Sequence, residues 1–485
     1  MATPRWPSRS RGRRSNSPMA TWPTTSSPLS RNTRKRSTRP EAVSTYRFHS
    51  RGPRPRGPRV VRAQHQYTST MVVGEFTQDT DVLVIGGGPG GYAAAFRAAQ
   101  LGRQVLLVDA RGSLGGTCLH AGCIPSKTRL HRSERGHEPG DRGAAAIDML
   151  TRGLQQQAKA LGVECIPGLA HFEDNRNVQI TGEQVSRARF KRAIIATGSN
   201  PVVREGSISP DEAATLGSTP SHAAVLGNDY LALEAATMLR GEGADVVLAC
   251  GEGGPLPDLP RALLKPLLRS LKTSGITMHE GDPASCRAEL VVDASGRRPA
   301  CDSMQPGKAG VQIDHEGWIQ VDAQQRTSEP RIFAVGDVTG GAMLAGCALA
   351  QGRVAAEAIC GQPSAYEPAA VPHLVFTDPN VAWCGDLQPS EDASITVIPW
   401  GHSGRAVGMD AAAGVTMLHW ERGSGLVLGV GICGSDACEL IETGVLAIEM
   451  GATLEDLAAI VPAHPTRSEL LAEAARAALL ETSDA

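Results

Sequence analysis

The stretch that decides the fold is residues 81–127, which read DVLVIGGGPGGYAAAFRAAQLGRQVLLVDARGSLGGTCLHAGCIPSK. An apolar run of strand length ends at Gly86, and Gly86, Gly88 and Gly91 fit the pattern G-x-G-x-x-G. A helical pattern starting at about Tyr92 follows, and a second apolar strand then ends at Asp109. Such a turn lets the backbone approach a pyrophosphate, and the acid can accept a hydrogen bond from a ribose hydroxyl. The stretch therefore predicts a dinucleotide-binding strand–helix–strand unit.

Two cysteines follow this unit closely. Cys118 and Cys123 have four residues between them. A disulfide across so short a loop adds little entropic stability, so it is a good candidate for a bond that opens and closes. A dithiol beside a dinucleotide indicates electron transfer. The alternative is a pair of unrelated reduced cysteines on one helix.

The same unit recurs later in the chain. The pattern predicts a strand, a helix and a second strand at residues 223–226, 230–239 and 244–249. The spacing from Gly227 to Cys250 equals the spacing from Gly86 to Asp109. Two copies with equal internal spacing predict two doubly wound nucleotide-binding domains.

Length and composition fit an enzyme of several domains. At 485 residues the chain is too long for a single core and should divide into about three domains. The net charge of -2 implies no nucleic-acid or acidic-surface partner as a global property. Eleven cysteines without a regular framework indicate a reducing compartment, and no apolar run approaches the ~20 residues of a membrane span. We therefore predict a cytoplasmic protein with no nucleic-acid partner, no membrane partner and no metal site.

The first 70 residues differ from the rest. They are rich in Arg, Ser and Pro, and Glu41 is their only acid. Such a segment cannot bury enough apolar surface to fold, so we expect a disordered or spurious extension ahead of Met71. The alternatives are an organelle-targeting segment, which would place the protein in the mitochondrial matrix, and a basic nucleic-acid-binding tail.

With these motifs in place, residues 81–127 resemble the flavoprotein disulfide reductases, the class I pyridine nucleotide-disulfide oxidoreductase family. The ending Ile124-Pro125-Ser126-Lys127 is most similar to the dihydrolipoamide dehydrogenase branch. The Asn-Val that usually follows the first cysteine and leucine is replaced by His120-Ala121, which leaves both thiols in place.

The resemblance implies that the first unit binds FAD. Later stretches that resemble FAD-binding elements are 168–171, 194–199, 332–337 and 343–345, although Gly346-Cys347 stands where the branch usually has His-Lys. The implied FAD residues are Gly86, Gly88, Gly91, Asp109, Gly116, Thr117, Lys127, Ala170, Thr197, Gly198, Asp337 and Ala345.

The resemblance implies that the second unit binds NAD, but this copy is altered. The implied NAD residues are Gly227, Asn228, Asp229, Cys250 and Gly296. Asp229 replaces a glycine, and two like charges about 4 Å apart repel by about 4 kcal/mol at an effective dielectric near 20. Cys250 replaces the acid that would hold the ribose, a hydrogen bond worth ~1.5–3 kcal/mol. We expect weak NAD binding, and the alternative is a domain kept for its shape.

Catalytic roles also follow from the resemblance. Cys118 would exchange with a dithiol substrate, and Cys123 would face the flavin. Lys127 would pair with Glu234 at the reactive face of the flavin. Residues 464–469, HPTRSE, resemble an acid/base unit in which the histidine reaches the disulfide of the partner subunit. The catalytic set is thus Cys118, Cys123, Lys127, Glu234, His464 and Glu469. Glu469 can also complete a helix capping box with Thr466, and the two roles can coexist.

The predicted fold class is α/β, with two doubly wound nucleotide domains followed by an α+β dimerisation domain. The expected parts are a disordered or targeting extension over residues 1–78, an FAD-binding domain over 79–212 and 301–368, a shortened NAD-binding-like domain over 213–300, and an interface domain over 369–485. Between residues 257 and 293 a β-meander is expected to be reduced or missing. The stretch 128–162 is expected to replace the helices that usually follow the redox cysteines.

The predicted function is FAD-dependent oxidation of dihydrolipoamide by a homodimer, with electrons passed to NAD. The implied partner is a lipoyl-bearing protein of a 2-oxo-acid dehydrogenase complex, or a similar dithiol. One alternative is a related flavoprotein disulfide oxidoreductase with a different electron acceptor. Another is a non-catalytic subunit of such a complex.

Overall fold

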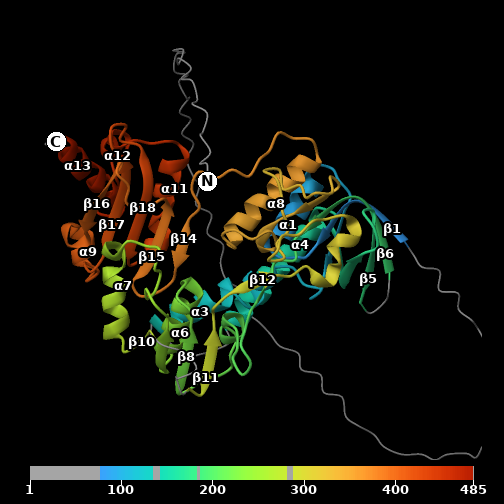
Figure 1. Cartoon of the computed structure of the whole chain (residues 1–485), viewed down its shortest axis with the longest axis horizontal. Coiled ribbons are helices and arrows are strands. Elements are labelled where there is room, and N and C mark those ends of the chain that lie inside the picture. The colour runs from blue at the N-terminus through green and yellow to red at the C-terminus, as the bar shows by residue number, and fades with distance from the viewer. Residues whose placement is uncertain (1–76, 135–141, 183–185, 281–287, 484–485) are drawn as a thin grey trace, which may run out of the picture. The chain divides into compact units, whose positions relative to one another are not determined.

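The computed structural model describes residues 77–134, 142–182, 186–280 and 288–483, which form three larger β-sheets with helices packed on them (Figure 1). The predictions for the basic N-terminal stretch fall on residues outside this range. Within the described ranges, no helix has both the length and the apolar composition that crossing a membrane requires.

The first sheet combines strands from two separate stretches of the chain. Its seven strands follow the order β3-β2-β1-β6-β5-β4, with β13 also paired to β6. The strands are β1 Thr77–Ile85, β2 Val105–Asp109, β3 Glu164–Pro167, β4 Leu169–Phe172, β5 Asn177–Thr181, β6 Ser186–Ile195 and β13 Ile332–Ala334. β1 is parallel to β2 and β6, and β13 is parallel to β6, so their carboxyl ends meet at one edge. In open α/β sheets, ligands bind at this edge.

Two helices cover one face of the first sheet and pack closely on each other. They are α1 (Pro89–Gln100) and α8 (Ala345–Ile359). A Cβ atom added at Gly352 would lie 2.3 Å from the carbonyl oxygen of Gly90, so the two backbones are in direct contact. α1 begins at Pro89 rather than at the predicted Tyr92, because proline fits the first turn of a helix.

The segment around and after the redox cysteines is helical. It contains α2 (Gly116–His120), α3 (Cys123–Glu134) and α4 (Arg142–Ala160). The prediction that residues 128–162 replace helices is therefore wrong. Glycine and clustered basic residues weaken the local helical signal, but tertiary packing stabilises α4 through Leu154 and the buried Ala158.

The second sheet is the predicted second strand–helix–strand unit with two further strands. Its order is β10-β9-β8-β11, and all four strands are parallel. Its elements are β8 His222–Leu226, α6 Tyr230–Gly241, β9 Asp245–Ala249, α7 Arg261–Thr273, β10 Thr277–His279 and β11 Leu290–Asp293. Between β10 and β11 the described residues contain no strand, and the intervening residues 281–287 lie outside the description.

The third sheet has five antiparallel strands in the order β14-β15-β18-β17-β16. Its strands are β14 His373–Val375, β15 Asn380–Gly385, β16 Ala393–Pro399, β17 Val415–Glu421 and β18 Val427–Gly434. The helices in this part are α9 Gly404–Gly408, α10 Ala437–Leu440, α11 Glu442–Glu449, α12 Leu454–Ala459 and α13 Glu469–Ser483. The apolar side of α13 contributes Leu470, Leu471 and Ala474 to the core of this part.

Short elements connect these sheets. They are the antiparallel pair β7 (Ser199–Pro201) and β12 (Arg297–Pro299), the helix α5 (Pro210–Ala213), and the 3-10 turns η2 Asp302–Met304, η3 Pro306–Ala309, η4 Gly336–Thr339 and η5 Trp400–His402. The first sheet pairs β4, β5 and β6 antiparallel beside its parallel strands, and the second sheet is wholly parallel. Two sheets built on parallel strands, followed by an antiparallel α+β part, confirm the predicted fold class.

Candidate active site

A cavity of about 450 Å³ lies at the carboxyl edge of the first sheet. All of the FAD residues implied by the sequence line it, except Gly91. Both redox cysteines and Lys127 also line it. The structure therefore collects residues from both stretches of the first sheet around one space.

The glycine turn after β1 leaves room for a phosphate group. Gly86 has φ +106°, and a Cβ at Gly91 would lie 1.8 Å from the carbonyl oxygen of Gly86. The N-cap of α1 is Gly88, which has no side chain to occupy the free amides of the first turn. Those amides can therefore bind an anion.

Other residues of the cavity fit the remaining parts of FAD. The carboxylate of Asp109 is held by the N–H of Gly87 at 2.7 Å and the N–H of Arg111 at 2.9 Å. The hydroxyl of Thr197 is buried and has no hydrogen-bond partner among the residues that the structure describes, as expected for a group that meets a polar ligand. The glycine cradle, the fixed acid and the unpartnered hydroxyl all fit FAD.

The two redox thiols are at the start of α2 and α3 and interact directly. A hydrogen bond between them raises the pKa of Cys118 and lowers the pKa of Cys123 to about 7. Burial opposes the decrease at Cys123, whereas the ammonium group of Lys127 favours it. When one of the two thiols is ionised, the negative charge therefore lies on Cys123 and Cys118 holds the proton.

Lys127 contacts two residues from other parts of the chain, Glu234 and Phe376. Its Nζ lies 2.5 Å from Oε2 of Glu234 on α6 and 5.1 Å from the ring centre of Phe376. The other carboxylate oxygen of Glu234 accepts the N–H of Phe376 at 3.1 Å. Burial raises the pKa of Glu234, and Lys127 opposes this effect. The Lys127–Glu234 pair thus joins α3 to α6 of the second sheet and, through Phe376, to the third sheet.

Ser199, Arg297 and Tyr230 are among the cavity residues that the sequence reasoning missed. Ser199 donates a hydrogen bond of 2.8 Å to Asp337, and Arg297 donates one of 2.7 Å to the hydroxyl of Ser199. Tyr230 lines the cavity four residues before Glu234, on the same face of α6. That helical spacing was a usable signal for Tyr230, whereas the Ser199–Arg297 contact depends on the pairing of β7 with β12.

The implied NAD residues do not line this cavity. Gly227 keeps the conformation of a nucleotide turn, with φ +133°. Asp229 is the N-cap of α6, and its carboxylate accepts the N–H of Ala232 at 3.1 Å. Burial raises the pKa of Asp229, whereas hydrogen bonds from backbone amides and the charge of Arg297 lower it by less. Asp229 therefore occupies a donor that a phosphate would use. Cys250 is buried at the end of β9.

His464 and Glu469 form a pair away from the cavity of their own chain. Nδ1 of His464 lies 3.1 Å from one carboxylate oxygen of Glu469, and the other oxygen accepts the N–H of Thr466 at 2.6 Å. These two contacts lower the pKa of Glu469, the amide of Thr466 most strongly. The carboxylate thus orients the histidine and holds the turn ahead of α13. The hydroxyl of Thr466 donates to the carbonyl oxygen of Ala463 at 2.7 Å, so the described contacts contain only the Glu469 half of the predicted capping box. The histidine side chain is 80% exposed, so a second molecule can reach it.

Comparison with known proteins identifies the class. A family model described as pyridine nucleotide-disulphide oxidoreductase matches residues 80–352, and the model of its dimerisation domain matches residues 371–475. The chain belongs to this family. It is a flavin-dependent oxidoreductase that uses dithiol–disulfide chemistry.

Curated relatives within the family are identical to this chain at about a third of the aligned residues. A dihydrolipoyl dehydrogenase of Geobacillus stearothermophilus is 35% identical over 84% of this chain and 98% of its own length. One of Haloferax volcanii is 36% identical with the same coverage.

Solved structures show the same fold at lower identity. The HOCl-induced flavoprotein disulfide reductase RclA from Escherichia coli has a TM-score of 0.76 at 24% identity, covering 81% of this chain and 98% of that one. LpdA from Mycobacterium tuberculosis has a TM-score of 0.75 at 22% identity, covering 82% of this chain and 99% of that one.

Proposed function

We propose that the chain oxidises a dihydrolipoyl group, or a similar small dithiol, through Cys118 and Cys123. The observation that carries this proposal is the position of the pair: both cysteines line the cavity that fits FAD, beside Lys127. The names of the curated relatives favour a dihydrolipoyl substrate.

In the proposed exchange, a substrate thiolate attacks Cys118 of the Cys118–Cys123 disulfide. The disulfide breaks, a mixed disulfide forms at Cys118, and Cys123 leaves as a thiolate. The second substrate thiol then attacks the mixed disulfide, which releases Cys118 and the oxidised substrate. A low pKa favours Cys123 as the leaving group. When bound, FAD supplies a two-electron carrier between the dithiol and the final acceptor.

His464 is proposed to accept the proton of the attacking thiol, while Glu469 fixes the orientation of its ring. Because His464 does not line the cavity of its own chain, we propose that a second copy supplies it in a homodimer. The matched dimerisation domain supports this arrangement.

For the final acceptor we propose NAD with weak binding, and an acceptor other than a pyridine nucleotide as the second candidate. The second candidate is favoured by Asp229, which caps the helix where the pyrophosphate would lie. Cys250, which stands where an acid would hold the ribose, also favours the second candidate.

We further propose a lipoyl-bearing protein of a 2-oxo-acid dehydrogenase complex as the partner. The five-part domain division given above also stays a proposal, as does a cytoplasmic location. If residues 1–70 direct import, the location is the mitochondrial matrix instead. Fractionation of cells that express the full chain or the chain from Met71 would distinguish the two locations.

The test is anaerobic titration of the purified flavoprotein with dihydrolipoamide. We expect loss of flavin absorbance and formation of lipoamide, because the dithiol can reach Cys118. Cys118→Ser is the matched control, since it keeps Cys123 but cannot form the mixed disulfide. Reduction of that variant at the wild-type rate would contradict the proposed function.

A further inference from the structure

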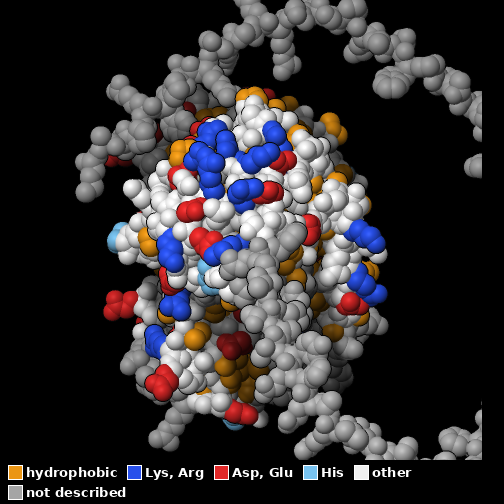
Figure 2. Space-filling model, turned by 90° about the vertical axis from the view of Figure 1, so that its right-hand side faces the viewer, with side chains coloured by type: hydrophobic (Ala, Val, Ile, Leu, Met, Phe, Trp, Pro, Cys, Tyr) orange, Lys and Arg blue, Asp and Glu red, His pale blue; other side chains and the backbone are white. Residues whose placement is uncertain are grey.

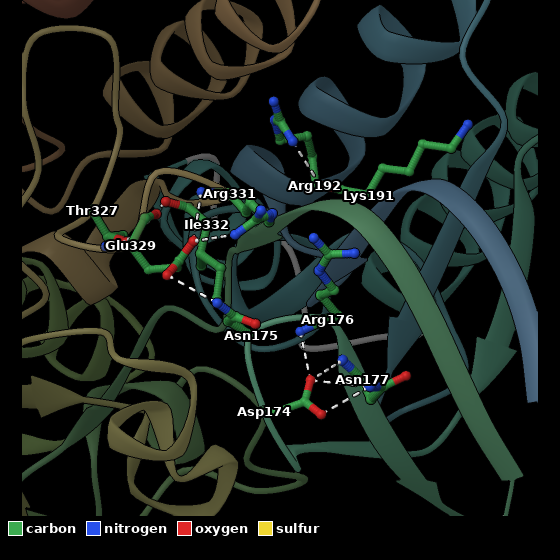
Figure 3. Close-up of polar contacts among 10 residues, drawn as sticks. All are labelled: Asp174, Asn175, Arg176, Asn177, Lys191, Arg192, Thr327, Glu329, Arg331 and Ile332. Atoms are coloured by element: carbon green, nitrogen blue, oxygen red, sulfur yellow. Dashed lines mark hydrogen bonds and ion pairs between the residues drawn. The ribbon is translucent and has the colours of Figure 1, made fainter.

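The feature concerned is a group of cations on the side of the first sheet where β5 and β6 run. Figure 2 looks onto that side and shows Lys and Arg side chains gathered in its upper part, with a few Asp and Glu among them. Arg176, Lys191, Arg192 and Arg331 belong to three segments of the chain, and we call these four residues the basic surface (Figure 3).

Strand β6 brings the three segments together. The N–H of Phe190 donates to the carbonyl oxygen of Arg176 at 2.9 Å, and the N–H of Ala193 donates to that of Arg331 at 3.0 Å. The other two members of the basic surface are the residues between Phe190 and Ala193. Four cations from three segments of the chain therefore occupy one short stretch of the sheet.

The loop that carries Arg176 is held in place by Asp174. One oxygen of its carboxylate accepts the N–H of Arg176 at 2.7 Å and the N–H of Asn177 at 2.8 Å. The side-chain amide of Asn177 donates to the other oxygen at 2.9 Å. Asp174 is thus engaged by its own turn, and the exposed guanidinium group of Arg176 stays outside that turn.

The loop that carries Arg331 is held in a similar way by Glu329. Its carboxylate accepts the side-chain amide of Asn175 at 3.2 Å and the N–H of Arg331 at 3.2 Å. The hydroxyl of Thr327 donates to the carbonyl oxygen of Ile332 at 2.9 Å and closes the loop. The contact between Asn175 and Glu329 joins this loop to the one that carries Arg176, so each loop helps to hold the other in place.

Half of the basic surface forms no ion pair with the described residues, although the carboxylate of Asp174 lies in the field of Arg176. Lys191 lies 2.7 Å from Asp81, and Arg331 lies 3.4 Å from the carboxylate of its own loop. Arg176 and Arg192 are exposed, and neither has a carboxylate partner among the residues that the structure describes. One N–H of the Arg192 guanidinium group donates to the carbonyl oxygen of Lys191 at 2.9 Å, and the other donors of the two groups are available to an outside ligand.

We propose that the basic surface docks a carboxylate-rich segment of a partner protein. Guanidinium groups match carboxylates through paired N–H donors, and two of them form no ion pair here among the described residues. A nucleic acid fits less well, because no member of the basic surface is an aromatic residue on which a base could stack.

The position of the surface separates it from the chemistry. Arg331 immediately precedes β13, so the basic surface lies at the amino end of that strand. The cavity lies beyond the carboxyl ends of the same parallel strands, where Ala196 and Val335 line it. A docked partner would leave the cavity open, so this proposal does not depend on which dithiol or acceptor the enzyme uses.

The test compares full-length wild type with the double variant Arg176→Gln/Arg192→Gln in binding a short, fluorescent, glutamate-rich peptide at low salt. We expect about fivefold weaker binding, because each exposed ion pair contributes a small amount. Added salt should weaken wild-type binding in the same way. The matched control is Arg152→Gln/Arg405→Gln, which makes the same charge change at exposed positions elsewhere and should bind like wild type.

Two further measurements complete the test. The variant Arg176→Lys/Arg192→Lys keeps the charge but loses the paired donors, so we expect intermediate binding. Oxidation of a small dithiol should be unchanged in all variants. Equal peptide binding by wild type and the Gln double variant would overturn the proposal. So would stronger binding of oligouridylate RNA or anionic vesicles than of the peptide, because the partner would then belong to another class.

Discussion

At the scale of single residues, the chemistry depends on which of two neighbouring thiols carries the proton. Cys123 accepts a hydrogen bond from Cys118 and lies in the field of Lys127, so the negative charge is on Cys123. Both causes come from residues within one short helical segment, and the sequence contains them together.

This arrangement makes a direct prediction for alkylation. In the reduced protein, iodoacetamide should modify Cys123 with a pH midpoint of about 7, because its pKa is lowered to that value. Cys118→Ala removes the hydrogen-bond donor, and Lys127→Met removes the cation, so each should move the midpoint to higher pH. Mass spectrometry would separate Cys123 from the other cysteines. An unchanged midpoint in both variants would show that these groups do not set the pKa.

A second residue-scale prediction concerns Arg467, which lies in the loop of His464. Its guanidinium group donates to the carbonyl oxygen of Ser435 at 2.6 Å, pairs with Asp436, and lies 5.6 Å from the ring centre of Trp400. These contacts fix the start of α13, so we expect Arg467→Leu to lower kcat by about tenfold, the loss of one charged hydrogen bond.

The control for Arg467 is a double-mutant cycle with Asp436→Asn. Asparagine also tolerates the left-handed backbone at this position, where φ is +57°. If the two residues act as a pair, the double variant should lose little more activity than Arg467→Leu alone. Simple addition of the two losses, or a large fall in the unfolding midpoint, would contradict a positioning role.

At the scale of elements, the two glycine turns differ in what covers the helix N-terminus. In the first turn Gly88 leaves the amides of α1 free, whereas in the second turn Asp229 caps α6 with its own carboxylate. Helices α1 and α6 therefore begin at equivalent positions of the two units, but only the N-terminus of α1 leaves its amides free for a pyrophosphate.

Restoring the second turn should strengthen NAD binding. We expect Asp229→Gly with Cys250→Glu to lower KM for NAD by an order of magnitude, since the two defects together cost a few kcal/mol. The corresponding measurement is steady-state NAD reduction by dihydrolipoamide. Tight NAD binding by the unchanged protein would refute this account of the turn. If the double variant still fails to bind NAD while dithiol reduces the flavin, the other-acceptor hypothesis gains support.

The contact between α1 and α8 gives a prediction about stability. Gly352→Ala places a Cβ against the carbonyl oxygen of Gly90 and should lower the free energy of unfolding by about 1–3 kcal/mol through overpacking. Gly346→Ala is the matched control on the same helix, because a Cβ there meets nothing within 4 Å. It should be neutral or stabilising, since alanine favours helix. Urea unfolding would measure both, and equal effects would contradict the backbone contact.

At the scale of the whole molecule, the proposed active site needs two chains. Protomers with His464→Gln and protomers with Cys118→Ser should each be inactive, but mixed dimers contain one complete site. Equal mixing should therefore restore about a quarter of wild-type activity, because half of the dimers are mixed and each has one working site of two. Mixed dimers isolated by two different tags should show about half of wild-type activity, since each has one working site of two. No recovery in verified mixed dimers would place His464 in the site of its own chain.

The sequence by itself determined the features that depend on local spacing. The run from Asp81 to Asp109 defined the first nucleotide-binding unit, and the repeated spacing at Gly227 defined the second. The cysteine pair was also visible, since it lies in one short segment. These features were predictable because a turn, a helix start and a disulfide loop involve neighbours along the chain.

Tertiary structure alone decided what depends on distant contacts. The helix α4 is stabilised by packing of its residue Ala158 against other elements rather than by local helix propensity, so its local sequence was misleading. The surroundings of Asp229 were also decided by packing, because burial in the fold raises the pKa of this carboxyl. The Ser199–Arg297 contact and the basic surface both require strands or loops that are far apart in the sequence. Local pattern cannot specify them, because the energy that selects them comes from packing between separate segments.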